Sequence, residues 1–548
     1  MLAGLLLAAS FPNFLSRDLG VAGLAWIAPG LILLTAIGKP AKQAFRIGWV
    51  AGFAHYLASL YWLLLIPVAW APILGWVALS AYLALYTAFW AWLCWRLFPK
   101  KLTDPEPAAD LASLAERFLS VPWTQRLIWA LTGAAIWVAL EMTVSRLMSG
   151  FPWNLLGASQ FRIVPLIQIS AFTGVYGVAF LVVWSSLSLL NALMVVIRKP
   201  AMRSAWVAEI ILPMAVVGAA YASGYQKLLH REPARPELSA ALIQPSIPQT
   251  LIWDPAGSTN RFQQLLQLSE AALTNKPDVL IWPEAAVPKL VRYDEETFQA
   301  ITGLARRHKV WMIIGSDDAE PRPHAADPNE TDYFNSSFLV SPEGKLVERY
   351  KKRNLVIFGE YIPLIHWLPF LKYFTPIEGG FASGDRAVPF RLGELNTKIS
   401  VLICFEDVFP HLVPEYVSDD TDFLVNLTNN GWFGEGAAQW QHAACAVFRA
   451  VENGVPLVRC SNNGLTCWVD SRGRIKQVFA SGKEGIYGPG FLVSHVPLLL
   501  PGEKRAPTFY REHGDLFGWT CVGITVLRLL QIAVRRRKSR PAPVGVPA

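Results

Sequence analysis

The stretch ISVLICFED, residues 399–407, decides how the second half of this chain folds. It begins as a nearly continuous apolar run that ends at Cys404, and the acids Glu406 and Asp407 follow almost directly. A short apolar run of this kind is typical of a β-strand that is covered on both faces. We therefore predict a buried strand with Cys404 at its end.

Similar runs lie on both sides of this stretch, between residues 238 and 460. They read LSAALIQ, DVLIW, VWMIIG, SSFLV, DFLVNL and PLVRC. Residues 259–274 and 437–452 have helical periodicity and are predicted to cover the strands. The pattern indicates an α/β or α+β domain. The acidic segment 317–332 contains proline and lacks periodicity, so we predict a solvated loop there.

The first part of the chain has a different composition. The whole sequence is 53% hydrophobic and 16% charged, whereas soluble proteins are about 45–50% apolar and about 25% charged. Only 21 of the 90 charged residues lie in residues 1–225. This distribution excludes a disordered chain and indicates an N-terminal membrane part. The net charge of +8 does not indicate nucleic-acid binding, because no basic stripe with interleaved aromatic residues is found.

Eight apolar segments are long enough, or nearly so, to cross a bilayer, which takes about 20 residues per helix. They are residues 1–14, 21–37, 47–66, 71–95, 127–145, 170–197, 205–222 and 516–534. The first is short and also resembles the core of a signal peptide. It lacks a basic start and an A-x-A site, so we favour a retained helix.

The basic residues between these segments predict the orientation. Sixteen Lys and Arg residues occupy one set of connections, namely 38–46, 96–126, 198–203 and the tail 535–548. The other short loops hold Arg17, Arg146 and Arg162. The positive-inside rule then assigns the basic set and both termini to the cytoplasm.

This orientation gives the predicted domain organisation. Residues 1–222 would form transmembrane helices 1–7, and residues 516–534 would form helix 8. The domain at 223–515 would lie on the outer face of the membrane, and 535–548 would be a basic cytoplasmic tail.

Four polar residues of the outer domain suit acyl transfer. Glu284 ends the run VLIWPE, Lys352 follows GKLVERYK, Cys404 ends its strand, and Glu360 lies in FGEY between them. A thiolate attacks a carbonyl, a carboxylate takes the thiol proton, and an ammonium stabilises the oxyanion. Singly, each also has a structural explanation: such a cysteine is commonly a core residue, and such a lysine or glutamate is commonly solvated. These residues by themselves leave both interpretations open.

Four motifs around these residues are more specific. WPE, YKKRNLVIFGEYIP, LICFED and LTNNGWFG occur in this order and together resemble the carbon-nitrogen hydrolase (nitrilase) superfamily. The resemblance implies an α-β-β-α sandwich with a Glu, Lys, Cys triad. Its motifs place Glu284 as general base, Lys352 as oxyanion donor and Cys404 as nucleophile, with Lys351 as a lower-ranked alternative to Lys352.

The resemblance extends over the whole chain. ASFPNF, GFPWNLLGASQ at 150–160 and IQPSIPQTLIWD at 243–254 are similar to the apolipoprotein N-acyltransferase family. That likeness implies Glu360 and Glu406 as supporting acids and Asn429 and Trp432 as residues of a substrate-binding loop. Phe405 stands where many relatives have tyrosine.

The implied reaction is a ping-pong acyl transfer in lipoprotein maturation. Cys404 would take an acyl chain from a phospholipid such as phosphatidylethanolamine, and the amine of a diacylglyceryl-cysteine at the N-terminus of an apolipoprotein would then accept it. The resemblance implies a multi-pass protein of the bacterial inner membrane with its catalytic domain in the periplasm. We expect no metal or organic cofactor, no nucleic acid and a monomer.

Two other functions compete with this prediction. A membrane-anchored nitrilase-type amidase would transfer acyl groups to water and would not need phospholipid. A transporter or scaffold would need polar networks inside the helices, for which Glu141 and Glu209 offer little support. We interpret both acids as structural or interfacial.

The segment YIPLIHWLPFLKYF, residues 361–374, is too apolar for an ordinary surface loop. It is predicted either to contact the outer leaflet or to pack as a buried helix. Trp432 and Phe433 form a possible second flap, and Trp253 is a weaker candidate for lipid contact. For Cys460 and Cys467, free buried thiols are favoured over a disulfide.

Overall fold

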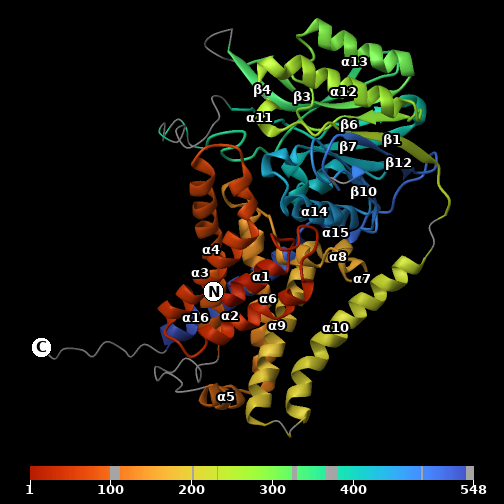
Figure 1. The fold of residues 1–548 in the computed structure, drawn as a ribbon. Helices are drawn as coiled ribbons and strands as arrows, with labels where there is room; N and C mark the ends of the chain where they lie inside the picture. The colour runs from red at the N-terminus through yellow and green to blue at the C-terminus, as the bar shows by residue number, and fades with distance from the viewer. Residues whose placement is uncertain are drawn as a thin grey trace, which may run out of the picture.

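The computed structural model describes two parts, a sandwich of two β-sheets and a set of long helices beside it (Figure 1). The described residues are those outside 99–110, 200, 202, 231–232, 253, 324–329, 364, 366, 368–369, 371–379, 483–484 and 539–548.

The first sheet has six strands in the order β12-β1-β2-β3-β4-β5. They are β1 (Glu237–Gln244), β2 (Val279–Ile281), β3 (Trp311–Pro321), β4 (Thr331–Val340), β5 (Leu346–Lys351) and β12 (Gly490–Pro497). Strands β1, β2 and β3 run parallel, while the other pairs are antiparallel. The carboxyl ends of the parallel strands therefore meet at one edge of the sheet.

The second sheet repeats this plan with the order β11-β10-β9-β8-β7-β6. Its strands are β6 (Pro389–Leu392), β7 (Thr397–Ile403), β8 (Phe423–Thr428), β9 (Leu457–Ser461), β10 (Cys467–Val469) and β11 (Ile475–Val478). Strands β7, β8 and β9 are parallel.

Helices cover the outer face of each sheet. α12 (Ser258–Leu273) and α13 (Glu295–His308) pack on the first sheet, where Leu265 and Ile301 join Leu280 and Ile314 in one apolar cluster. α14 (Ala438–Asn453) packs on β9 and β10 of the second sheet. The result is an α-β-β-α sandwich, which confirms the α/β domain expected from the sequence.

The seven apolar runs predicted as strands all lie in strands, and the predicted helices 259–274 and 437–452 correspond to α12 and α14. The loop predicted at 317–332 is wrong at both ends. β3 continues to Pro321 and β4 begins at Thr331, and the two strands pair over their whole length. These polar residues adopt an extended conformation because each strand forms hydrogen bonds with the other. A local sequence pattern does not show which strands will pair.

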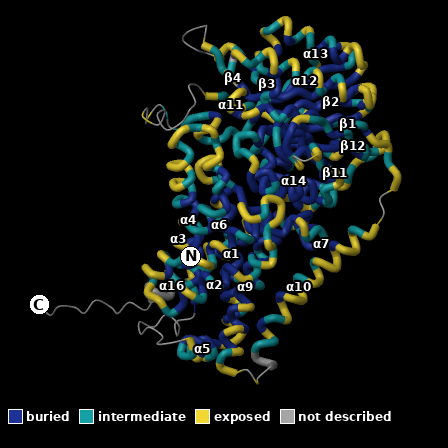
Figure 2. Tube along the Cα trace, in the orientation of Figure 1, coloured by how far each residue is buried: buried dark blue, intermediate teal, exposed yellow. Residues whose placement is uncertain are grey.

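Helices fill the remaining part of the molecule. The main ones are α1 (Leu2–Ala9), α2 (Ala28–Ala36), α3 (Ala41–Ser59), α4 (Ala71–Leu97), α6 (Trp123–Val144), α9 (Val175–Arg198), α10 (Arg203–Leu229) and α16 (Leu516–Lys538). Within the described ranges, five stretches are long and apolar enough to cross a membrane: Ala71–Leu97, Trp123–Val144, Val175–Arg198, Trp206–Leu229 and Leu516–Val534. Figure 2 shows many exposed residues along α10, as expected of a helix that faces lipid.

Some predicted spans differ from the helices. The segment predicted at 1–14 is an eight-residue helix that ends at Ala9, shortly before Pro12. The segment predicted at 170–197 is broken at Gly174, whose φ is +63°. The seventh predicted span ends at 222, but α10 continues to Leu229. Proline and left-handed glycine end helices even in apolar sequence.

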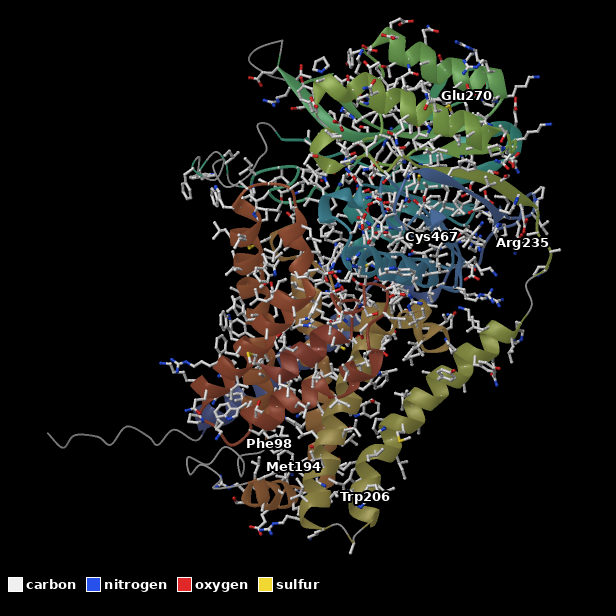
Figure 3. All side chains as sticks on the ribbon, viewed as in Figure 1. Phe98, Met194, Trp206, Arg235, Glu270 and Cys467 are labelled. Atoms are coloured by element: carbon white, nitrogen blue, oxygen red, sulfur yellow. The ribbon has the colours of Figure 1, made fainter. Side chains whose placement is uncertain are left out.

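The described parts of the basic connections lie at the end of the helices that is remote from the sandwich. Trp95 donates its indole N–H to the carbonyl of Lys39 at 2.8 Å, so the loop after α2 adjoins the end of α4. Arg198, at the end of α9, pairs with Glu116 of α5 (Leu111–Leu119). Figure 3 shows Phe98, Met194 and Trp206 at this end and Glu270 of α12 at the opposite end of the molecule.

The two acids among the helices have structural partners. Glu209 pairs with buried Arg126 at 2.6 Å. Glu141 accepts hydrogen bonds from the backbone N–H of Leu156 (2.7 Å) and from the indole of Trp137 (2.9 Å). Both acids therefore hold helices and their connections in place.

Candidate active site

Cys404 lies at the turn between β7 and the short 3-10 helix η9 (Cys404–Val408). Its φ is +50°, an uncommon value for a residue with a side chain. Two side chains hold its carbonyl oxygen: Asn426 Nδ2 at 3.0 Å and His442 Nε2 at 3.2 Å. The residue as a whole is half-buried. The backbone at this cysteine is thus fixed by two side chains of the second sheet and its covering helix.

Lys352 follows β5 and lies between two carboxylates. Its Nζ is 2.8 Å from Glu360 Oε1 and 3.5 Å from Glu284 Oε1, and all three residues are buried. Glu284 follows β2, at the carboxyl edge of the first sheet. The adjacent Lys351 instead pairs with Glu320, which leaves Lys352 as the lysine of this site.

Asn335 of β4 joins the two carboxylates, although the sequence analysis did not single it out. Its Nδ2 donates to Glu284 Oε1 and to Glu360 Oε1, both at 2.8 Å. The other oxygen of Glu284 accepts from the backbone N–H of Asn429 at 2.8 Å. We call Glu284, Asn335, Lys352 and Glu360 the front network. Asn335 lies in a polar stretch of a strand, where its local sequence carries no recognisable signal.

The pKa shifts at the site indicate which groups are charged at neutral pH. Burial and the charge of Glu284 raise the pKa of the Cys404 thiol to about 12, against the opposing effect of Lys352. Burial alone would lower the pKa of Lys352, but the carboxylates of Glu360 and Glu284 outweigh it and raise that pKa. At neutral pH the thiol is protonated and the lysine charged. The sulfur therefore needs a base, and Glu284 is the acid whose charge acts on it most.

Glu406 connects the cysteine turn with the lysine loop. Its Oε2 accepts from the backbone N–H of Ile403 at 2.7 Å, and its Oε1 accepts from Tyr350 Oη at 2.7 Å and from the backbone N–H of Arg353 at 2.8 Å. Burial raises the pKa of Glu406, and these donors oppose the shift. This acid positions Cys404 relative to Lys352.

A second polar network lies behind the cysteine. Asp407 pairs with Arg459 at 2.8 Å and with His442 Nε2 at 2.7 Å. Burial and the charge of Arg459 lower the pKa of His442. The histidine is therefore neutral, with Nδ1 accepting from Arg459 and Nε2 donating to Asp407. We call Asp407, His442 and Arg459 the rear network, which the sequence analysis missed.

The site lies directly against the helical part of the molecule. The ring of Phe405 stacks on Trp153, from the connection after α6, with centroids 6.0 Å apart. Gln441 of α14 accepts from the indoles of Trp62 and Trp153 at 3.0 and 2.7 Å. Its amide also donates to the carbonyls of Pro12 and Ser59. Every hydrogen-bonding atom of the Gln441 side chain thus contacts the helical part.

The loop after β8 also adjoins the helices. Asn429 is buried, and its side chain bonds to Gln249 (2.9 Å), to Asn462 (3.0 Å) and to the backbone of Gly431. The 3-10 helix η11 (Asn430–Phe433) contains the partly exposed Trp432. Phe433 contacts the ring of Trp62 at 4.5 Å. Asn429 therefore positions Glu284, while Trp432 and Phe433 border the helices.

Two predicted lipid contacts lie wholly or partly outside the described residues. Trp253 is one of them. Of segment 361–374, only 361–363, 365, 367 and 370 are described, and Trp367 is 84% exposed. All six cysteines are free, including Cys460 and Cys467. Among the described residues, no group of three or more His, Cys, Asp or Glu is placed to hold a metal ion.

Two family models match this chain. Carbon-nitrogen hydrolase matches residues 239–487, and the apolipoprotein N-acyltransferase N-terminal domain matches residues 3–188. The first covers the sandwich apart from β12, and the second covers the helices from α1 into α9.

Curated relatives match over nearly the full length. The apolipoprotein N-acyltransferase of Geobacter metallireducens is 36% identical over 98% of this chain and 95% of its own length. The enzyme of that name from Brucella suis is 30% identical over 94% and 91%. The one from Chlorobaculum tepidum is 26% identical over 98% and 96%. The likeness therefore includes the helices as well as the sandwich.

Proposed function

The chain belongs to the apolipoprotein N-acyltransferase family and is an acyltransferase of lipoprotein N-acylation, and we propose that it works through a thioester on Cys404. The observation that carries this proposal is the meeting of Glu284, Lys352 and Cys404 beside the helices. The carboxylate and the ammonium both act on the thiol, and the ring after the cysteine stacks on the connection that follows α6.

In the first half-reaction, Glu284 takes the proton of the thiol, and the sulfur attacks the ester carbonyl of a phospholipid. Lys352 stabilises the negative charge on the carbonyl oxygen. The C–O bond then breaks, and the departing lysophospholipid oxygen receives the proton from Glu284. We propose phosphatidylethanolamine as the donor.

In the second half-reaction, the α-amine of a diacylglyceryl-cysteine attacks the thioester carbonyl. The C–S bond breaks, Glu284 passes the proton that the amine loses to the sulfur, and the product is an amide. Because an amide is more stable than a thioester, this half runs downhill. Glu284 and Lys352 have the same roles in both halves, so one chain suffices and we propose a monomer.

The surroundings of Cys404 support a lipid acyl chain as the transferred group. Phe151 and Trp153 contact Phe405 with centroids 5.9 and 6.0 Å away, and Phe433 adjoins Trp153 at 6.3 Å. Aromatic side chains of both parts thus surround the residue next to the nucleophile. An apolar surface of this kind excludes water, which would otherwise hydrolyse the thioester.

We further propose that the eight apolar segments cross the bacterial inner membrane, five of them as single long helices, and that the sandwich lies in the periplasm. The basic loops gather at the end of the helices that is remote from the sandwich. The positive-inside rule places that end in the cytoplasm.

Labelled phospholipid tests the chemistry. Purified protein is incubated with phospholipid that carries a radioactive acyl chain, and we expect label on the protein that hydroxylamine removes. Cys404→Ala should abolish the label. Cys467→Ala removes another free thiol, buried in β10, and should leave it unchanged. Normal labelling of Cys404→Ala would refute the nucleophile.

Single cysteines test the orientation. Glu296→Cys places an exposed thiol on α13, and Lys199→Cys places one on the connection between α9 and α10. A membrane-impermeant maleimide applied to cells with a permeabilised outer membrane should label the first and not the second. The reverse pattern would overturn the topology.

A further inference from the structure

Asp317 of β3 lies beside the front network. It pairs with Asn335 in the antiparallel register of β3 and β4, so both side chains lie on one face of the sheet. On the same face Ile313 joins the apolar cluster between the sheets, whereas its neighbours Met312 and Ile314 pack under α12 and α13. The Asp317 carboxylate therefore faces the second sheet, on the side that carries the site.

The amide of Asn335 has a fixed orientation and an unused oxygen. Two carboxylates accept from its Nδ2, which settles the assignment of its nitrogen and oxygen. Its Oδ1 has no hydrogen-bond partner among the described residues, and the residue is only 5% exposed. A buried acceptor without a donor is costly, so this atom indicates a missing donor.

The charges around this oxygen favour a cation. Three acids face the site: Asp317, Glu284 and Glu360. The positive charge of Lys352 lies among them, with its Nζ next to Glu360 and Glu284. No hydrogen bond or ion pair of the described residues involves the Asp317 carboxylate, and the residue as a whole is half-buried. Burial and the charges of Glu284, Glu360 and Asp318 raise the pKa of Asp317 to about 7.

The other nearby cations are held elsewhere. Arg292 and Arg349 pair with Asp318 and Glu320, and Lys351 lies over the ring of Phe334 at 3.8 Å. Asp318 and Phe334 alternate with Asp317 and Asn335 along their strands and so lie on the opposite face of the sheet. Among the described residues, no further cation is therefore free to reach Asp317, and a ligand can supply one.

We propose that Asp317 and the Oδ1 of Asn335 bind a primary ammonium group of a substrate. Such a group offers N–H donors to both acceptors and a positive charge to the carboxylate. The inference rests on the proposed function, in which both substrates carry this group: the ethanolamine head of the donor lipid and the α-amine of the acceptor.

Equilibrium binding tests the inference without turnover. The Cys404→Ala protein is placed in nanodiscs and titrated with a diacylglyceryl-cysteinyl peptide, either with a free amine or N-acetylated. A second titration compares short-chain phosphatidylethanolamine with phosphatidylglycerol. We expect the ammonium form to bind about tenfold more tightly in at least one pair, and Asp317→Asn to abolish that preference.

The pair that shows the preference identifies the source of the ammonium. Asp332→Asn is the matched control, because Asp332 lies on the opposite face of β4 and pairs with Arg322 at 2.7 Å. It should keep the preference. Equal binding within both pairs, or a preference that survives Asp317→Asn, would overturn the inference. Absence of a thioester in the unsubstituted protein would instead refute the proposed function, whatever the binding shows.

Discussion

The two polar networks on either side of Cys404 differ in how they use their charges. In the front network, Lys352 and Glu360 carry charges that act on the half-buried Cys404, and Asn335 keeps an acceptor that has no partner among the described residues. In the rear network, Asp407 and Arg459 are completely sealed from solvent, and their histidine holds the backbone of the nucleophile. The charges of both networks are buried, but those of the front network lie beside the half-buried Cys404, whereas those of the rear network hold the turn that carries it. Removing members of each network tests this division.

Glu284→Gln should give the largest loss of rate. The amide keeps the shape of the side chain but cannot take the thiol proton, so thioester formation should slow by about 10²- to 10⁴-fold. Single-turnover labelling from phospholipid measures this, and the thermal midpoint in detergent checks the fold. Normal labelling kinetics would exclude Glu284 as the base.

Lys352→Met should slow thioester formation by about 10²- to 10³-fold, because the oxyanion loses its cation. The lysine also lowers the pKa of Cys404, which is about 12 with it present. Its removal should raise that pKa further and leave less thiolate at any pH below it. Alkylation by iodoacetamide at pH 9 should therefore slow as well, and faster alkylation would contradict the sign. Lys351→Met is the matched control for both measurements.

Asp407→Asn tests the rear network. It should lower the stability of the fold more than it slows thioester formation. It leaves Arg459 buried without its carboxylate, at a cost of about 3–5 kcal/mol. We expect a clearly lower thermal midpoint, with less than a tenfold loss of rate in the protein that remains folded. A loss as large as that of Glu284→Gln with unchanged stability would give Asp407 a chemical role.

Gln441→Leu should have the smallest effect. It leaves two indoles without an acceptor and two carbonyls without a donor, which lowers stability by about 1–3 kcal/mol. We expect a lower thermal midpoint and a few-fold slower thioester formation. Gln439→Leu alters a neighbouring residue of α14 that bonds within the sandwich, which makes it the matched control. Equal midpoints for Gln441→Leu and the unsubstituted protein would show that the helices do not depend on this contact.

The sequence predicted those features that depend on local pattern or on shared motifs. The apolar runs identified seven strands, and the motifs placed Glu284, Lys352 and Cys404 at strand ends. The sequence did not predict that Asn335 or the rear network belongs to the site. Pairing between strands and packing of α14 bring these residues together, and a local sequence pattern shows neither. The wrong prediction of a loop at 317–332 has the same cause, because the pairing of β3 with β4 makes both ends of that segment into strands. Likewise, the apolar pattern predicted unbroken helices at 1–14 and 170–197. The first ends shortly before Pro12, and the second is interrupted at Gly174.

One apolar cluster joins the two parts of the protein, from Leu7 and Trp90 of the helices through Trp153 to Val401 and Val447 of the sandwich. A catalytic domain cut from its helices would lose the ring under Phe405 and all four partners of Gln441. The turn that carries Cys404 is therefore packed as described only when sandwich and helices belong to one intact chain. We accordingly expect full activity from a protein in its membrane and little from a detached sandwich.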